Sequence, residues 1–247
     1  MNKKEKLENL TYELFKDLAR DQSLSKAEKI GFYDSLRTGQ SAAILADLKT
    51  KIPALKEEKR MVIDIGCGCG ELLEALSDLA AEQKHQLVLN DSSEMLANVA
   101  DKPYQKKIAG KFPSESLAAL KDEVGQADVI LVYSVFHYVF QEGQQQPFIE
   151  ALLALLAPGG QLLIGDIPNV SMRNRFFSSE AGLKFHAKNT GSSEPPVLAH
   201  EQGEINDQTL LDIIKTCRKQ GYHAYIVPQG AELPMANRRE DLLIIRP

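Results

Sequence analysis

Apolar residues in this chain follow two different periods, and the change between them falls near residue 60. The first set recurs at steps of three and four: Leu7, Leu10, Leu14 and Leu18. That spacing predicts one apolar face of a helix. Residues 42–48 predict a second short helix, and no strand pattern precedes Met61. The chain up to about Pro53 is therefore expected to form a helical cap over a core that follows it.

From Met61 onward, short apolar runs alternate with amphipathic segments. The runs predict strands beginning at Met61 and over Gln86–Leu89, Lys106–Ala109, Ala127–Tyr133, Gln161–Gly165, Tyr222–Val227 and Asp241–Ile245. The amphipathic segments predict helices after Gly70 and over Ser93–Ala100, Pro147–Ala157 and Asp207–Gln220. Alternation of this kind predicts an α/β fold, a parallel sheet with helices on both faces. The loop between the last two strands is too short for a helical crossover, so these strands should pair antiparallel.

Residues 167–206 do not follow the alternation. They hold Pro and Gly residues with little periodicity, and they come directly after the fifth strand. An insertion of this length in a compact domain is usually a lid or a binding loop. It leaves the sheet at its carboxyl edge, where open α/β sheets bind ligands.

Composition narrows the class of protein. A chain of 247 residues suits one domain with an appendage, and a formal charge of −5 argues against a nucleic-acid partner. The N-terminus lacks the apolar core of a signal peptide, no run is long enough to cross a membrane, and a cytoplasmic location is expected. The three cysteines have no disulfide or zinc spacing, so no metal site is expected from them.

The segment from Met61 to Leu73 reads MVIDIGCGCGELL, an apolar strand, a glycine turn and a helix start. Its pattern, D-x-G-x-G-x-G, does not fit the dinucleotide fingerprint G-x-G-x-x-G, which disfavours a nucleotide-dependent oxidoreductase. The segment resembles motif I of the class I S-adenosylmethionine-dependent methyltransferases. That resemblance covers roughly Lys59 to Pro247. It implies a Rossmann-like seven-stranded sheet whose last strand inserts antiparallel beside the fifth, with a cap over 1–55 and a core over 56–247.

The resemblance also implies a cofactor site for S-adenosylmethionine. Asp64 would organise the amino group of the cofactor, and the turn would pass its methionine part: Gly66, Cys67, Gly68 and Gly70. An acidic residue after the second strand would hold the ribose hydroxyls. Aligned on Met95, that position falls on Asn90, with Asp91 one residue later, so either residue is a candidate. Alternatively, Asp91 only caps the helix near Ser93.

Chemistry is expected at the ends of the fourth and fifth strands, which flank the transferred methyl group in this family. Ser134, like Met95, is predicted to contact the cofactor, and Tyr138 is predicted to contact the substrate. His137 is a candidate general base because its ordinary pKa is near neutrality. A packed, structural histidine is the alternative. Asp166 could orient or deprotonate a hydroxyl. Only Ser134 is available as a ligand on the fourth strand, so magnesium dependence is not expected. In this family an acidic side chain after the third strand often lies near the adenine amino group. Residues 109–113 contain no carboxylate, so the sequence does not locate the adenine site.

Substrate-binding candidates come from the cap and the insertion: Tyr33, Arg37, Arg173, Arg175 and His186. Arginines beside a cofactor cleft suit a phosphate or carboxylate, although a solvated basic loop is as common. The cap and the insertion also loosely resemble bacterial methyltransferases of surface carbohydrate pathways. The sequence therefore predicts methyl transfer to a hydroxyl, or another nucleophile, of a small polar molecule such as a sugar or sugar nucleotide. An RNA or protein methyltransferase and a non-catalytic cofactor-binding protein stay open.

Overall fold

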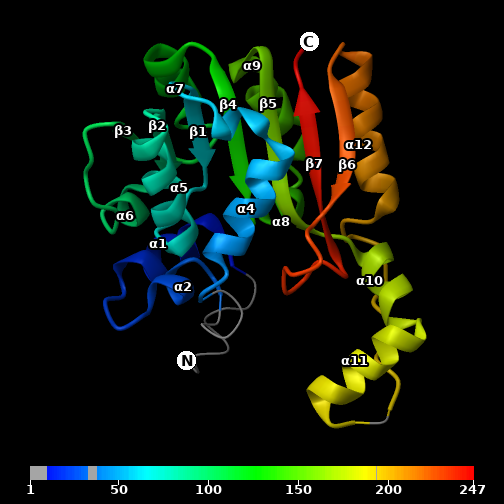
Figure 1. Cartoon of the computed structure of the whole chain (residues 1–247). Helices are drawn as coiled ribbons and strands as arrows, with labels where there is room; N and C mark the ends of the chain where they lie inside the picture. The colour runs from blue at the N-terminus through cyan, green and yellow to red at the C-terminus, as the bar shows by residue number, and fades with distance from the viewer. Residues whose placement is uncertain (1–9, 33–37, 193) are drawn as a thin grey trace.

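A computed structural model describes residues 10–32, 38–192 and 194–247 of the chain, and it contains one seven-stranded sheet (Figure 1). The strands are β1 (Met61–Ile65), β2 (Gln86–Asp91), β3 (Gln105–Ala109), β4 (Ala127–Tyr133), β5 (Leu156–Pro168), β6 (His223–Pro228) and β7 (Arg239–Ile245). Their order is β3-β2-β1-β4-β5-β7-β6. The first five strands pair in parallel, and β7 runs antiparallel to both β5 and β6. The predicted fold class is therefore confirmed.

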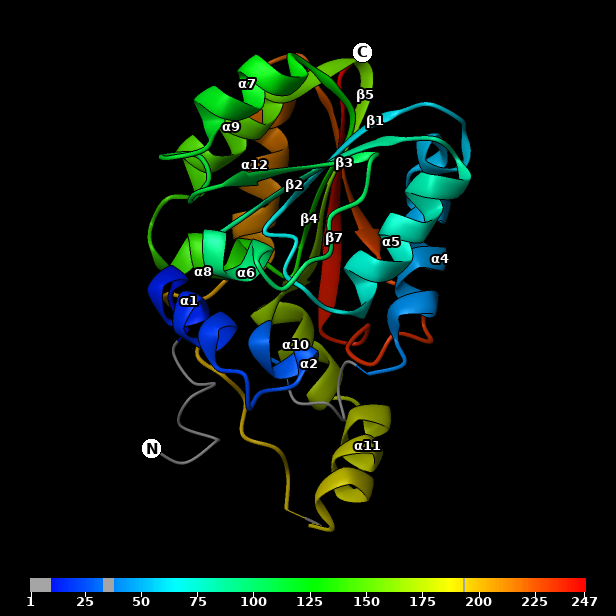
Figure 2. The ribbon, with the colours of Figure 1, turned by 90° about the vertical axis from the view of Figure 1, so that its left-hand side faces the viewer.

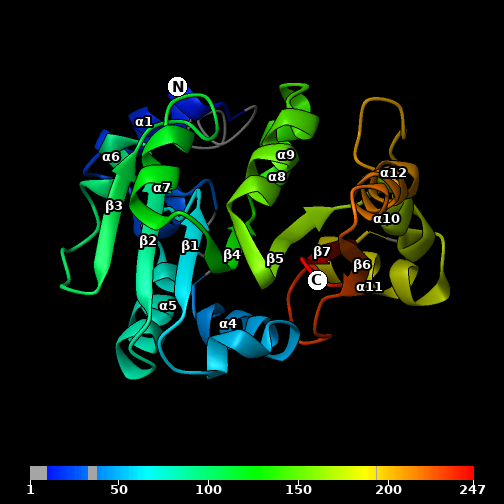
Figure 3. The same ribbon diagram turned by 90° about the horizontal axis from the view of Figure 1, so that it is seen from above.

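Helices cover both faces of the sheet, as Figures 2 and 3 show from two directions. One face carries α4 (Ser41–Lys51) and α5 (Glu71–Glu82), with the short 3-10 helix η2 (Pro53–Lys56) beside α4. The other face carries α7 (Leu117–Val124), α8 (Phe136–Gln141), α9 (Gln145–Leu155) and α12 (Asp207–Lys219). Part of the segment expected to cap the core thus packs directly on the sheet.

The central strands are apolar on both sides because each side faces a helical layer. In β4, Val129 and Leu131 belong to the core under α4 and α5, whereas Ile130 and Val132 belong to the core under α9 and α12. None of the four is more than 2% exposed. Two hydrophobic cores therefore hold the sheet rigidly, and its strand ends can position side chains.

Two N-terminal helices, α1 (Tyr12–Arg20) and α2 (Lys26–Lys29), lie at the carboxyl ends of the parallel strands, next to α6 (Ser93–Leu96) (Figure 1). The side chain of Thr11 accepts a hydrogen bond from the backbone N–H of Leu14 and starts α1. A capping box of Ser25 and Glu28 starts α2. These caps fix both helices over the edge of the sheet where ligands bind in this fold class.

The insertion is helical, contrary to the expectation of an aperiodic loop. It contains α10 (Val170–Phe177) and α11 (Glu180–Thr190), which extend from the carboxyl end of β5 as an arm (Figure 1). Asn169 and Ser179 cap their N-termini, and Gly191 ends α11 with a φ of 70°. Few of the arm's side chains are buried, so the sequence lacks the apolar periodicity that reveals a helix packed on a core.

Several element boundaries also differ from the prediction. The fifth strand starts at Leu156, before Pro158-Gly159-Gly160, because Leu156 pairs with Ala127 and a register shift absorbs the turn residues. The helix expected over Ser93–Ala100 ends at Leu96. Within the described residues, no helix has the length and apolar character needed to cross a bilayer.

Candidate active site

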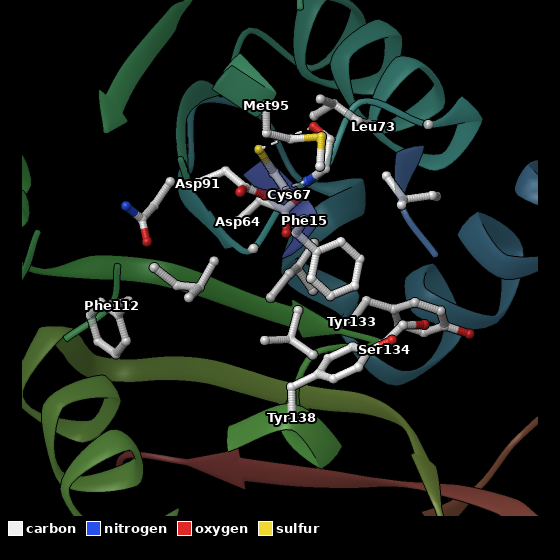
Figure 4. Close-up of a pocket in the computed structure, with 18 of the residues that line it drawn as sticks. Phe15, Asp64, Cys67, Leu73, Asp91, Met95, Phe112, Tyr133, Ser134 and Tyr138 are labelled. Atoms are coloured by element: carbon white, nitrogen blue, oxygen red, sulfur yellow. Dashed lines mark hydrogen bonds between the residues drawn. The ribbon is translucent and has the colours of Figure 1, made fainter. Parts of the chain in front are cut away.

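One cavity opens at the carboxyl ends of β1, β2 and β4 and is covered by α1 (Figure 4). All nine residues predicted to bind the cofactor line it: Asp64, Gly66, Cys67, Gly68, Gly70, Asn90, Asp91, Met95 and Ser134. The predicted substrate residue Tyr138 lines it as well. Parallel strands bring these residues together because their carboxyl ends lie along the same edge of the sheet.

The glycine turn after β1 needs glycine for two reasons. Gly66 and Gly68 have φ values of 70° and 62°, in the left-handed region that side chains disfavour. A Cβ on Gly66 would lie 2.5 Å from Cγ2 of Val135, and a Cβ on Gly68 would lie 2.7 Å from Cγ2 of Ile30. The turn is thus packed between the residue after β4 and the end of α2.

Two carboxylates, Asp64 and Asp91, line the cavity beside this turn. Burial, with a contribution from the charge of Asp91, raises the pKa of Asp64 to about 7. Burial also raises the pKa of Asp91 to about 6, although hydrogen bonds from the backbone N–H groups of Gly68 and Ser92 oppose the shift. Among the described residues, no side-chain cation lies within 4.0 Å of either carboxylate. The pair therefore forms a negative, incompletely compensated site.

Asn90 and Asp91 have different partners. The Asn90 amide donates to the carbonyl oxygens of Ile108 at 2.9 Å and Gly110 at 3.0 Å, so it joins the ends of β2 and β3. The alternative in which Asp91 only caps a helix is wrong. Ser92 is the N-cap of α6, since its hydroxyl accepts from the backbone N–H of Met95 at 3.1 Å.

Several residues that line the cavity were not singled out in the sequence. Tyr12 and Phe15 come from α1, and the segment after β3 contributes Gly110, Lys111 and Phe112. Lys111 forms an ion pair with Glu142 at 2.7 Å and lies 5.6 Å from the ring centroid of Tyr12. Tyr12 and Phe15 are three residues apart, so the sequence places both on one face of a helix. Only tertiary packing places that helix over the cavity.

Ser134 and Asp166, at the ends of β4 and β5, are hydrogen bonded to each other and have φ values of 62° and 61°. Asp166 is 3% exposed and forms an ion pair with Arg239 at 2.6 Å. It does not itself line the cavity. Two adjacent residues in a strained conformation often mark a functional site.

His137 follows in α8, with its ring centroid 3.8 Å from that of Tyr138. Its Nδ1 atom is buried and has no hydrogen-bond partner among the described residues. Burial, together with the charge of Arg239, lowers the pKa of His137 to about 4, although the charge of Asp166 opposes the shift. The imidazole is therefore neutral at pH 7, and it lies beside the cavity without lining it.

Tyr33 and Arg37 lie outside the described residues. The other predicted substrate residues, apart from Tyr138, do not line the cavity. Arg175 is exposed and pairs with Asp207. His186, on α11, contacts the ring of Phe177 at 6.3 Å between centroids. Arg173, on α10, lies 5.1 Å from the same ring.

The described part of the chain contains no cluster of three or more His, Cys, Asp or Glu side chains suited to a metal ion.

The cavity fits S-adenosylmethionine on the evidence of its own residues. Its buried carboxylates suit the cationic amino acid part of that cofactor, and the turn offers backbone without side chains at Gly66, Gly68 and Gly70. Apolar side chains such as Phe112 and Met95 suit a flat base. Strand order and site together define the class I, S-adenosylmethionine-dependent methyltransferase fold.

Comparison with known proteins agrees with this class. Residues 63–162 match the family model described as a methyltransferase domain. A segment of 159 residues, 61% of the chain, is 28% identical to the chondramide synthase cmdD of Chondromyces crocatus, of which the match covers only 4%. Among solved structures, the plantazolicin methyltransferase BpumL, in complex with a triazolic desmethylPZN analog and SAH, covers 98% of each chain at 17% identity with a TM-score of 0.56.

The N-methyltransferase NodS of Bradyrhizobium japonicum WM9, in complex with S-adenosyl-L-homocysteine, has a TM-score of 0.58 at 13% identity over 96% of this chain and 98% of its own. At these sequence identities the structural matches establish the fold alone. The match to the family model identifies residues 63–162 as a methyltransferase domain. The chain therefore contains this domain and has the fold of the class I S-adenosylmethionine-dependent methyltransferases.

Proposed function

We propose that the protein transfers a methyl group from S-adenosylmethionine to a hydroxyl, or another nucleophile, of a small polar molecule. The observation that carries this proposal is an aromatic contact that covers part of the cavity. Phe15 of α1 contacts Tyr138 of α8 edge to face, with ring centroids 5.0 Å apart, and both line the cavity. A cover of this kind leaves room for a small acceptor group rather than for a nucleic-acid duplex.

Within this proposal, Asp64 and the glycine turn hold the amino acid part of the cofactor. Asp91 serves the ribose hydroxyls, since Asn90 already bonds the backbone after β3. The base lies among Gly110, Phe112 and Met95. When bound, the cofactor supplies a methyl group on an activated sulfonium. The chain's own residues align the nucleophile and exclude water.

His137 is the proposed acceptor of the proton that a hydroxyl loses. Its imidazole is neutral at pH 7, so it can take a proton, and its Nδ1 atom has no partner among the described residues. The low pKa makes it a weak base, which suits a transfer in which the proton leaves late. Asp166 is proposed as a positioning residue, because its carboxylate holds Ser134 and is itself held by Arg239.

The known relatives support methyl transfer but do not identify the acceptor. The plantazolicin methyltransferase structures contain desmethylPZN analogs, and NodS is described as an N-methyltransferase. The acceptor of this chain must therefore be inferred from residues around its own cavity.

The first test is calorimetric titration with S-adenosylhomocysteine, with NAD as the control ligand. Saturable binding of the former alone supports the cofactor assignment. Incubation with labelled S-adenosylmethionine and pools of small hydroxyl, amine and carboxylate compounds then tests for transfer. Binding of NAD, or of neither ligand, would contradict the proposal.

A further inference from the structure

We propose that the acceptor carries an anionic oxygen group, a carboxylate or a phosphate, that binds between Arg173 of α10 and Arg238, the residue before β7. This inference rests on the proposed function and specifies its substrate class. It concerns a half-buried basic cluster at the junction of β5 and α10, outside the cofactor cavity.

One residue, Asn169, joins the two arginines through its backbone. Its N–H donates to the carbonyl oxygen of Arg238 at 3.1 Å, and its carbonyl oxygen accepts from the N–H of Arg173 at 2.9 Å. Arg239, the residue after Arg238, is the register partner of Pro168 in the β5–β7 ladder. The backbones of three arginines therefore meet the chain at the end of β5.

Nearby carboxylates are engaged by other groups. Asp166 pairs with Arg239, Asp207 pairs with Arg175, and the Glu240 carboxylate accepts from the Asn169 amide. Within the ranges that the structure describes, neither Arg173 nor Arg238 has a carboxylate within 4.0 Å. Among the described residues, two guanidinium groups in this cluster therefore have no anionic partner.

The polar contacts of these two arginines are weak or local. Arg173 donates to the carbonyl oxygen of Val197 at 3.3 and 3.4 Å and to the side chain of Asn174 at 3.4 Å. Arg238 donates to the side chain of Asn237 at 2.9 Å. Burial lowers the pKa of Arg238, and the charges of Arg239 and Arg173 lower it further. An oxyanion would relieve this repulsion through charge-assisted hydrogen bonds, for which the fork of a guanidinium is well suited.

The cluster is connected to the methyl-transfer side of the cavity. Arg239 donates to Asp166, and Asp166 accepts from Ser134, which lines the cavity. In the proposed site, an acceptor anchored at Arg173 and Arg238 extends toward the ends of β4 and β5, where Ser134 and Tyr138 line the cavity. The anion selects and orients the acceptor, and the cavity residues align its nucleophile.

The test uses the full chain saturated with S-adenosylhomocysteine and two probes, inorganic phosphate and acetate, titrated at constant ionic strength. Phosphate binding is followed by the phosphorus NMR line width and acetate binding by methyl line width. The variants are Arg173→Gln, Arg238→Gln and the matched control Arg175→Gln, which removes a paired arginine from the same helix. Arg238→Lys retains a charge and controls for loss of folding.

At least one probe should bind the wild type saturably, and the better probe distinguishes phosphate from carboxylate. Each of the two glutamine variants should weaken that binding by about tenfold or more, as expected for one lost charge-assisted contact. Arg175→Gln should match the wild type, and Arg238→Lys should bind more tightly than Arg238→Gln. S-adenosylhomocysteine affinity should not change in any variant.

Two results overturn the inference: no saturable binding of either probe, or equal losses in Arg175→Gln and Arg238→Gln. Either result with intact S-adenosylhomocysteine binding refutes the anion site alone. Loss of S-adenosylhomocysteine binding by the wild type would instead refute the proposed function.

Discussion

The Asp91 carboxylate accepts a hydrogen bond from the backbone N–H of Gly68 at 2.9 Å, which ties the end of β2 to the glycine turn after β1. Asp64 lies on the same side of the cavity, and each carboxylate raises the cost of burying charge there. In the proposed function this cost is offset when a cationic cofactor binds. The same two residues should therefore oppose stability and favour binding.

Asp64→Asn tests this opposition. The substitution removes a buried charge whose pKa is raised to about 7, so the apo protein should become more stable at pH 8. At ~1.4 kcal/mol per pKa unit, the free energy of unfolding should rise by about 1–4 kcal/mol. S-adenosylhomocysteine affinity should fall by about tenfold or more, as for loss of a charged hydrogen bond.

Thermal unfolding and calorimetry measure the two effects, and the exposed Asp78→Asn is the control. A variant that loses stability while retaining wild-type affinity would show that Asp64 is a structural residue.

The same carboxylates predict opposite pH dependences for stability and binding. The folded pKa values, about 7 for Asp64 and about 6 for Asp91, lie above the ordinary value of 3.8. Between pH 4 and 7 the folded apo protein thus binds more protons than the unfolded chain, and the contribution of these groups to stability falls as pH rises. S-adenosylhomocysteine affinity should instead fall as pH drops from 7.5 to 5. Protonation of Asp64 removes the charge that attracts the ammonium group, and protonation of Asp91 removes a charge-assisted bond to the ribose hydroxyls.

Unfolding and titration at matched pH values separate these two trends. In the double variant Asp64→Asn with Asp91→Asn, the affinity should be nearly independent of pH over this range. An unchanged acid loss of affinity in that variant would assign it to other groups.

Contact between the cap and the glycine turn can be tested with two matched glycines. A Cβ on Gly70 would lie 2.7 Å from Cδ1 of Ile30, but its φ of −85° suits any residue. Gly70→Ala should therefore destabilise the protein by about 1–3 kcal/mol through overpacking, and Ile30→Ala should largely reverse that effect. Gly68→Ala should remain destabilised with Ile30→Ala by roughly 1 kcal/mol, because its φ of 62° is strained for alanine.

Denaturant unfolding of the wild type, the three single variants and the two double variants gives the coupling energies. Equal rescue of both alanine substitutions would mean that backbone conformation at Gly68 matters little. No rescue of either would mean that Ile30 does not pack on the turn.

His137→Gln should lower kcat by about 10²–10⁴-fold if the imidazole is the general base. S-adenosylhomocysteine affinity should stay near that of the wild type, because His137 does not line the cofactor cavity. Since its pKa is lowered to about 4, kcat at saturating cofactor should not fall between pH 8 and 6 in the wild type. Steady-state kinetics with the acceptor found by screening measures both quantities.

A wild-type kcat in His137→Gln would remove the histidine from the reaction. A kcat that falls near pH 6.5 in the wild type would show that another group, with an ordinary histidine pKa, controls the reaction.

Sequence patterns located most of the strands and the glycine turn because these features depend on local residue order. The continuous apolar run of Ala127–Tyr133 indicates a strand covered on both faces, and the turn from Asp64 to Gly70 requires glycine at specific positions. The antiparallel terminal pair followed from the length of a loop. The helices of the arm were missed because few of their residues are buried.

By itself, then, the sequence determined the fold class and the segments that form the cofactor cavity, since strand period, turn chemistry and helix caps act between near neighbours. Only the tertiary structure decided the roles of residues distant in sequence. It assigned Asn90 to the backbone after β3 and paired Asp166 with Arg239 across 73 residues. It also brought Phe15 against Tyr138. Burial and charge proximity set these pairings, and both depend on how the two cores pack around the sheet.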